Sequence, residues 1–199
     1  MAERCGREGD TGRWRQRELA LTDTINTRLF DEDGACYYDY DKARKCHTGI
    51  LSPASLMPLY IGIADQAMGS AVADLAVDEK KLYPSFPTVA FDHPAYTAGQ
   101  KSYSWRGPVW LNVAFFALQG LRRYGMVEQA DRSRELLLGW CDRNDSIYEC
   151  YDAGTGDPRG APNFGWSAAF VIEMLLGWDD HLERFPCVSP ATQSGARRV

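Results

Sequence analysis

Residues 109–124 read VWLNVAFFALQGLRRY, a stretch that is apolar on nearly every side until its last turn. A second stretch of this kind, FGWSAAFVIEMLL at residues 164–176, carries Glu173 as its only charge. A helix that is apolar all round is buried on every side. We therefore expect both segments to be inner helices that other elements surround.

Three other helical segments are polar on one side. Residues 127–141 carry six charged or amide side chains: Glu128, Gln129, Asp131, Arg132, Arg134 and Glu135. Such a helix buries a single stripe and belongs on the outside, and we expect the same of residues 14–30 and 65–77. A further segment begins at Pro53, a suitable first-turn residue, and holds Leu56, Leu59, Tyr60 and Ile63. The six segments thus alternate between outer and inner helices.

The lengths of the loops alternate in the same way. Gly125 alone separates the fourth segment from the fifth, and Gly62 separates the second from the third. Long loops instead cover residues 31–52, 78–107 and 142–162. Loops longer than about 15 residues are uncommon in compact domains and usually functional. If neighbouring helices are antiparallel, all three long loops emerge where the inner helices begin.

The joint alternation predicts an all-α fold, an α/α toroid in which about six helices form part of an (α/α)6 barrel. An irregular helical bundle is the alternative. A six-fold double ring needs twelve helices, so the chain fits half of one. We expect residues 13–180 to form this partial domain, with a poorly defined N-terminal tail at 1–12 and a C-terminal tail at 181–199. No strand is clear, although residues 35–40 can pair briefly.

The composition is that of an ordinary globular protein, with 45% hydrophobic residues and a net charge of −5 over 199 residues. The acidic balance argues against a nucleic-acid partner. No apolar run reaches the roughly 18 residues of a membrane span, and without a recognisable leader a cytoplasmic location follows by default. The six cysteines form no CxxC pair and only three histidines are present. We therefore expect no metal and no cofactor.

The third long loop contains a candidate general base. In DRNDSIYECYDAGTGDPRGAPNF, Glu149 lies between Tyr148 and Tyr151. A carboxylate among aromatic rings on a cavity loop suits that role, because burial tunes its proton affinity. A solvated loop glutamate is the ordinary alternative. Asp152 and Asp157 compete, but they lie nearer the turn glycines and are typical of turns.

The second long loop ends SYSWRGPVW, at the mouth of an inner helix. Trp105 and Trp110 offer flat faces that suit the apolar faces of sugar rings. Arg106 has forked donors that can hold a hydroxyl or a carboxylate, and Gly107 permits a close approach of the backbone to a ligand. Trp166 opens the last inner helix in the same manner. Core packing is the alternative for all three tryptophans.

Together the segments SWRGPVWLNVAFFALQGLRRYG and YECYDAGTGDPRGAPNFGWSAAFVIEMLLG resemble the C-terminal part of glycoside hydrolase family 63 and its mannosylglycerate-hydrolase-like members. LFDEDGACYYDYD and the Pro58-Leu59-Tyr60 element are similar to earlier family segments, so the resemblance covers about Leu19 to Trp178. It implies an (α/α)6 barrel that hydrolyses an α-linked glucosyl or mannosyl residue with inversion. The substrate would be an oligosaccharide or a small glycoside.

The resemblance also implies roles for single residues. Glu149 corresponds to the general base, with Tyr151 as the motif tyrosine and Thr155-Gly156 as the turn. The residues implied to bind the sugar are Trp105, Arg106, Gly107, Trp110, Tyr151 and Trp166.

One family feature is missing. The general acid of the family is an aspartate in an S-G-x-D-x-S-P segment, and the nearest piece here, residues 50–53, has no aspartate. Inverting hydrolysis requires two carboxyl groups about 6.5–9.5 Å apart. We therefore expect either a glycosidase domain that is active only when completed, or a non-catalytic sugar-binding or assembly protein. The expected protein partners are a second copy of the chain or a complementing N-terminal half. A terpene-cyclase-like toroid is a third reading, but the acidic run at 31–33 has the wrong spacing.

Overall fold

The structure, a computed structural model, describes residues 5–96 and 105–185. Its α-helices are α1 (Thr11–Arg28), α2 (Met57–Ile61), α3 (Gln66–Ala76), α4 (Leu111–Arg123), α5 (Val127–Asp142), α6 (Gly165–Leu176) and α7 (His181–Arg184). Two 3-10 helices, η2 (Glu8–Asp10) and η3 (Pro53–Leu56), precede α1 and α2. The first six α-helices match the six predicted segments, and the mostly helical toroid fragment is confirmed. The described part of the chain continues beyond residue 180 through α7.

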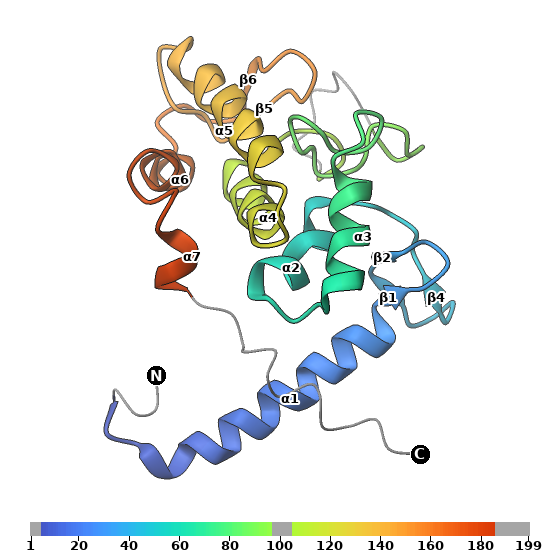
Figure 1. Ribbon diagram of the computed structural model, residues 1–199. Helices are drawn as coiled ribbons and strands as arrows, with labels where there is room; N and C mark the ends of the chain where they lie inside the picture. Colours follow the sequence, from blue (N-terminus) through green and yellow to red (C-terminus); the bar gives the residue numbers. More distant parts are fainter. Residues whose placement is uncertain (1–4, 97–104, 186–199) are drawn as a thin grey trace.

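Helix α4 lies at the centre of the molecule, between α2 on one side and α5 and α6 on the other (Figure 1). Eight of its residues are buried: Leu111, Ala114, Phe115, Ala117, Leu118, Gln119, Gly120 and Leu121. Gly120 allows the close contact with η3 and α2, because a Cβ there would lie 3.0 Å from the Leu56 carbonyl oxygen of η3 and 3.1 Å from the Tyr60 backbone nitrogen of α2. The prediction that this helix is buried is confirmed.

The last inner helix differs from the prediction. On α6, Ile172 and Leu175 are each 56% exposed and Leu176 is 83% exposed. The expectation of burial on every side is wrong for this helix, because among the described elements α4, α5 and α7 are the helices that lie beside it (Figure 1). Its opposite face, with Val171 and Met174, packs into the core.

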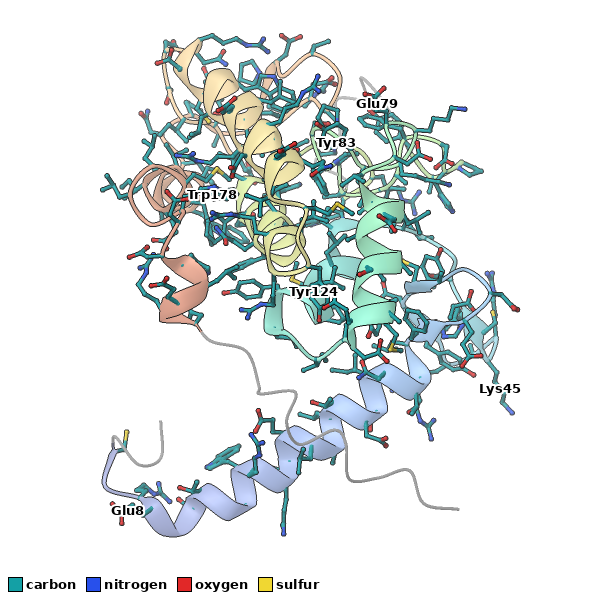
Figure 2. The ribbon with its side chains drawn as sticks, in the orientation of Figure 1. Glu8, Lys45, Glu79, Tyr83, Tyr124 and Trp178 are labelled. Carbon is teal, nitrogen blue, oxygen red and sulfur yellow. The ribbon has the colours of Figure 1, made fainter. Side chains whose placement is uncertain are left out.

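Helix α1 is attached to the body through its last turns. Asn26 accepts a hydrogen bond from the Tyr37 hydroxyl at 2.8 Å and donates one to the Ile63 carbonyl at 2.8 Å. No residue of α1 is buried, and its first half extends away from the other helices (Figure 1). Side chains fill the space between the remaining helices; Tyr124, for example, lies by the turn that joins α2 to α3 and donates to the Ala64 carbonyl at 2.7 Å (Figure 2).

The long loops contain three antiparallel hairpins of two-residue strands. These are β1 (Phe30–Asp31) with β2 (Cys36–Tyr37), β3 (Tyr40–Asp41) with β4 (Cys46–His47), and β5 (Cys150–Tyr151) with β6 (Pro158–Arg159). Only pairing near residues 35–40 was expected, because two residues are too few to show a strand's alternating pattern. The loops also contact one another: Ala90 of the second loop donates to the Leu51 carbonyl of the first at 3.0 Å.

Cysteines 5, 36, 46, 141 and 150 are free thiols, and Cys187 lies outside the described residues. Among the described residues, none of the helices has the length and apolarity that crossing a membrane requires.

Candidate active site

Glu149 lies directly before β5, on the hairpin of the third loop. Its backbone N–H donates to the Ala161 carbonyl at 3.0 Å, and its carboxylate Oε2 accepts from the Ala161 N–H at 3.3 Å. Its own carbonyl accepts a hydrogen bond from the Ser167 hydroxyl at 3.1 Å. These contacts fix Glu149 between the end of the hairpin and the first turn of α6. The side chain is half-buried.

Gly160 makes room for the Glu149 carboxylate. A Cβ at this position would lie 2.5 Å from Oε2 and 2.7 Å from the Glu149 Cβ. The backbone there has φ +77°, in the left-handed region that favours glycine. Both constraints therefore require glycine opposite Glu149. The sequence analysis missed this residue; its only signal is a glycine just after a hairpin strand.

Asp152 organises the turn of the same hairpin. One carboxylate oxygen accepts from the backbone N–H groups of Gly154 and Thr155, each at 3.0 Å, and the other pairs with Arg159 at 2.6 Å. Burial acts to raise the pKa of Asp152, but the Thr155 and Gly154 N–H groups together with Arg159 outweigh it and leave the pKa below its ordinary range. These contacts give Asp152 the turn-forming role that the sequence analysis set against a role as general base.

Tyr151 holds the hairpin against α5. Its ring is fully buried, and its hydroxyl oxygen accepts from the Tyr148 backbone N–H at 3.1 Å. The hydroxyl also hydrogen-bonds the Cys141 thiol on α5, and burial raises the pKa of Tyr151. The structure thus places the motif tyrosine beneath Glu149, as a support for the hairpin.

Three tryptophans form an open aromatic platform beside the hairpin. The Trp105 and Trp110 rings stack in parallel, with centroids 4.5 Å apart and planes 8° apart. The Trp166 ring lies 6.3 Å from Trp110. Trp110 is buried, whereas Trp105 and Trp166 are about half exposed. The platform therefore presents aromatic surface to a ligand at the start of two inner helices.

The segment that carries Trp105 and Trp110 is pinned at two places. Val109 exchanges backbone hydrogen bonds of 2.8 and 3.0 Å with Tyr151, which joins this segment to the Glu149 hairpin. Val109 and Trp110 therefore precede the helix, which begins at Leu111, although the apolar stretch that predicted it starts at residue 109. The buried Gly107 donates its N–H to the Thr88 hydroxyl at 3.0 Å, a contact that the sequence did not indicate. Arg106 is exposed beside it.

The structure thus gathers the predicted site residues into one region. Glu149 is tied to α6 through Ser167, and Trp110 is tied to the hairpin through the Val109 bridge. The Glu149 carboxylate itself is turned toward Gly160 and Ala161. The geometry combines a carboxylate with a flat aromatic surface, the combination suited to a sugar ring and a water molecule.

Comparison with known proteins identifies the family. The "Mannosylglycerate hydrolase MGH1-like glycoside hydrolase domain" matches residues 1–167. This chain belongs to that family. The match includes the first residues of the chain, ahead of Leu19, where the resemblance of the motifs begins. It ends near the start of α6.

Three mannosylglycerate hydrolases are 30–32% identical to this chain over most of its length. A mannosylglycerate hydrolase of Rubrobacter radiotolerans is 30% identical over 88% of this chain, and mannosylglycerate hydrolase MGH1 of Selaginella moellendorffii is 31% identical over 86%. The crystal structure of the GH63 mannosylglycerate hydrolase from Thermus thermophilus in complex with Tris and D-glycerate superimposes with a TM-score of 0.65 at 32% identity over 72% of the chain. The chain spans only 34–40% of the length of these relatives.

Proposed function

We propose that this chain supplies the base-bearing part of the active site of an inverting glycoside hydrolase. Its substrate would be a small glycoside with an α-linked mannosyl or glucosyl residue, such as mannosylglycerate. The observation that supports the proposal is the hairpin that carries Glu149, which is bonded to the first turn of α6 through Ser167 and to the segment of Trp105 and Trp110 through the Val109–Tyr151 bridge. The names of the relatives support the substrate class, since one binds D-glycerate and the same enzyme has been crystallised with glucose.

In this proposal the Glu149 carboxylate takes a proton from a water molecule as the water attacks the anomeric carbon. The attack comes from the face opposite the leaving group, so the configuration inverts. Trp105 and Trp166 hold the sugar ring, and Arg106 contacts a hydroxyl. The general acid comes from outside this chain, because the sequence holds no counterpart of the family's acid motif.

A non-catalytic carbohydrate-binding protein is the second candidate function. The exposed aromatic surface of Trp105 and Trp166 favours it, because stacking on a sugar requires no acid. A barrel completed by the part that this chain does not span distinguishes the two functions: the hydrolase proposal expects cleavage of the glycoside, and the binding proposal expects binding without cleavage.

Sugar binding by the chain alone tests the platform directly. We expect mannosylglycerate or methyl α-glucoside to change the tryptophan fluorescence of the chain, and Trp105→Ala to weaken this binding about tenfold or more, the loss of about 1.4 kcal/mol of stacking. Trp14→Ala is the matched control, because Trp14 on α1 is 51% exposed and Trp105 is 53% exposed. Equal affinity in the two variants, or no binding by the unmodified chain, would exclude the platform as a sugar site.

A further inference from the structure

The second long loop contains a buried run that ends in the core of the molecule. Residues 85–90 are all buried, and Phe86 and Ala90 belong to the hydrophobic core. The backbone of the run is tied to the first loop, because Ala90 donates to the Leu51 carbonyl at 3.0 Å. Thr88 lies in the middle of this run and is 7% exposed. Its hydroxyl is therefore held in place by the core.

The Thr88 side chain contacts two consecutive peptide groups of the platform segment, residues 105–110. Its hydroxyl oxygen accepts from the Gly107 N–H at 3.0 Å and donates to the Pro108 carbonyl at 3.2 Å. The backbone N–H of Thr88 donates to the same carbonyl at 3.2 Å. Gly107 is buried, so its N–H needs a partner within the protein. A hydroxyl can accept and donate at the same time, which an aliphatic side chain of the same shape cannot do.

These three hydrogen bonds lie between the two ends of the platform segment. On one side Val109 is bonded to Tyr151 and so to the Glu149 hairpin. On the other side lie Trp105 and Arg106. Trp105 is 53% exposed and stacks on Trp110, so its ring is placed by this stacking and by the backbone that carries it. The bonds to Thr88 therefore fix the point from which Trp105 and Arg106 leave the core.

We propose that Thr88 is a positioning residue for the sugar platform, and that its hydroxyl sets the places of the Trp105 ring and of Arg106. Without the hydroxyl, the buried Gly107 N–H loses its partner, and an unpaired buried donor is costly. The platform segment relieves this cost by moving toward water, which takes the Trp105 ring away from Trp110. The consequence for sugar binding rests on the proposed function, whereas the positioning of the Trp105 ring does not.

Fluorine NMR of the whole chain labelled with 5-fluorotryptophan tests the positioning. Trp105→Phe assigns the Trp105 resonance among the six tryptophans, and the ring current of Trp110 influences its chemical shift. Thr88→Val keeps the shape of the side chain and removes the hydroxyl, and we expect it to move this resonance toward that of the free amino acid. Thr88→Ser keeps the hydroxyl and is expected to retain the shift of the unsubstituted chain. Thr88→Ala replaces the valine variant if the latter does not fold.

Ser85→Ala is the matched control. The Ser85 hydroxyl belongs to the same buried run, is 1% exposed and hydrogen-bonds no other described residue. Its removal is expected to leave the Trp105 resonance unchanged. Binding of mannosylglycerate or methyl α-glucoside, followed by the fluorescence of the unlabelled chain, is expected to weaken about fivefold or more in Thr88→Val and to stay within about twofold in Thr88→Ser and Ser85→Ala.

Several results would overturn the proposal. An unchanged Trp105 resonance or an unchanged sugar affinity in Thr88→Val would do so, as would a serine variant that behaves like the valine variant. An equal change in Ser85→Ala would mean that the whole run has loosened. If neither Thr88→Val nor Thr88→Ala folds, the hydroxyl serves the fold rather than the platform. A Trp105 resonance that depends on the hydroxyl, in a chain that binds no sugar, keeps the positioning role and rejects the proposed function.

Discussion

The position of the Glu149 carboxylate depends on Gly160, a residue without a side chain. The positive φ of this glycine and the 2.5 Å between its hypothetical Cβ and Oε2 act together. A general base must stand within hydrogen-bond reach of the water it activates. A small displacement of the carboxylate therefore breaks this contact with water, although replacing Gly160 by alanine adds only a methyl group.

Gly160→Ala is expected to lower the free energy of unfolding by about 1–3 kcal/mol, the cost of a left-handed non-glycine residue. It should also displace the Glu149 side chain. Chemical denaturation measures the first effect, and a crystal structure of the variant shows the second. Gly154→Ala in the same turn is the control, because a Cβ there meets its nearest atom only at 3.6 Å. Equal stability of the two variants would refute the steric argument.

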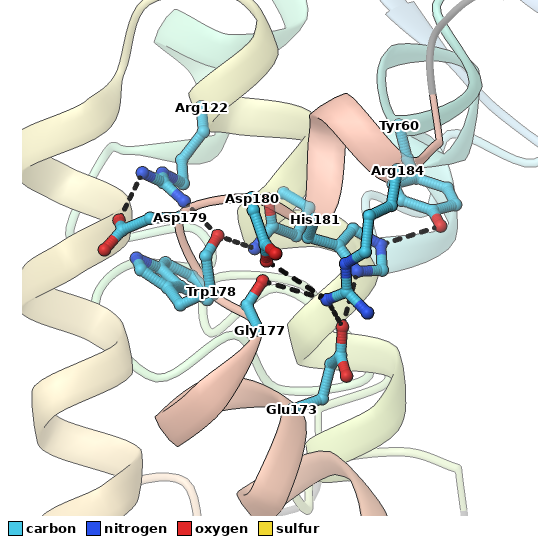
Figure 3. Close-up of polar contacts among 10 residues, drawn as sticks. Tyr60, Arg122, Glu173, Gly177, Trp178, Asp179, Asp180, His181 and Arg184 are labelled. Carbon is cyan, nitrogen blue, oxygen red and sulfur yellow. Dashed lines mark hydrogen bonds and ion pairs between the residues drawn. The ribbon is translucent and has the colours of Figure 1, made fainter.

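At the scale of elements, a polar cluster fastens α7 to the base of the inner helices (Figure 3). The buried His181 imidazole lies between the Glu173 carboxylate, at 2.9 Å from Nδ1, and the Tyr60 hydroxyl, at 3.0 Å from Nε2. Arg184 also pairs with Glu173. The hydrogen bond from His181 lowers the pKa of Glu173, and Arg184 adds to the effect against the opposing influence of burial.

Because the folded-state pKa of Glu173 is depressed, its contribution to stability is present above the ordinary carboxyl pKa. It is lost as the pH falls through the lowered value. We expect Glu173→Gln to cost about 1 kcal/mol at neutral pH, discounted for partial exposure, and to cost less as the solution is acidified. Denaturant titrations at several pH values measure this. Glu183→Gln, an exposed acid on α7 itself, should have little effect, and a pH-independent cost in Glu173→Gln would contradict the ion-pair explanation.

The helices could be predicted because their signal is local. The apolar pattern of α4, Pro53 at the start of η3 and the single glycines between helices all lie within a few residues of the structure they determine. Apart from the pairing near residues 35–40, the hairpins could not be predicted, because two-residue strands show no alternating pattern. The fastening of α7 could not be predicted either, since Tyr60 and His181 meet across 121 residues. The candidate site could be predicted in part. Short motifs pointed to Glu149 and the tryptophans, but the roles of Gly160, Thr88 and Ser167 arise from contacts between segments that are distant in the sequence.

At the scale of the whole molecule, the described residues form an arc of three inner helices in which only α4 has an inner helix on both flanks. The inner-helix row α2–α4–α6 is flanked on its outer side by α3 and α5 (Figure 1). Glu149 lies at the end of this arc where α4 and α6 begin. The arc therefore presents a base and a sugar platform to a space that other helices must enclose.

The isolated chain is accordingly expected to hydrolyse α-mannosides and α-glucosides far below the rate of a complete family member. The missing general acid alone accounts for about 10²- to 10⁴-fold. Release of free sugar from a small panel of α-glycosides measures this, with the Thermus thermophilus enzyme as reference. Turnover at the reference rate would mean that an aspartate of this chain, such as Asp39 or Asp92, serves as the acid.

The role of Glu149 is tested most directly by Glu149→Gln in a chimera in which this chain replaces the matched segment of the Thermus thermophilus mannosylglycerate hydrolase. The amide keeps the shape of the side chain but cannot take a proton from water. We predict that hydrolysis of mannosylglycerate falls by at least about 10²-fold, while the affinity for the sugar, followed by tryptophan fluorescence, stays within a few-fold of the unsubstituted chimera. Hydrolysis at the unsubstituted rate by the Gln variant would contradict the account and make Asp152 the next candidate base.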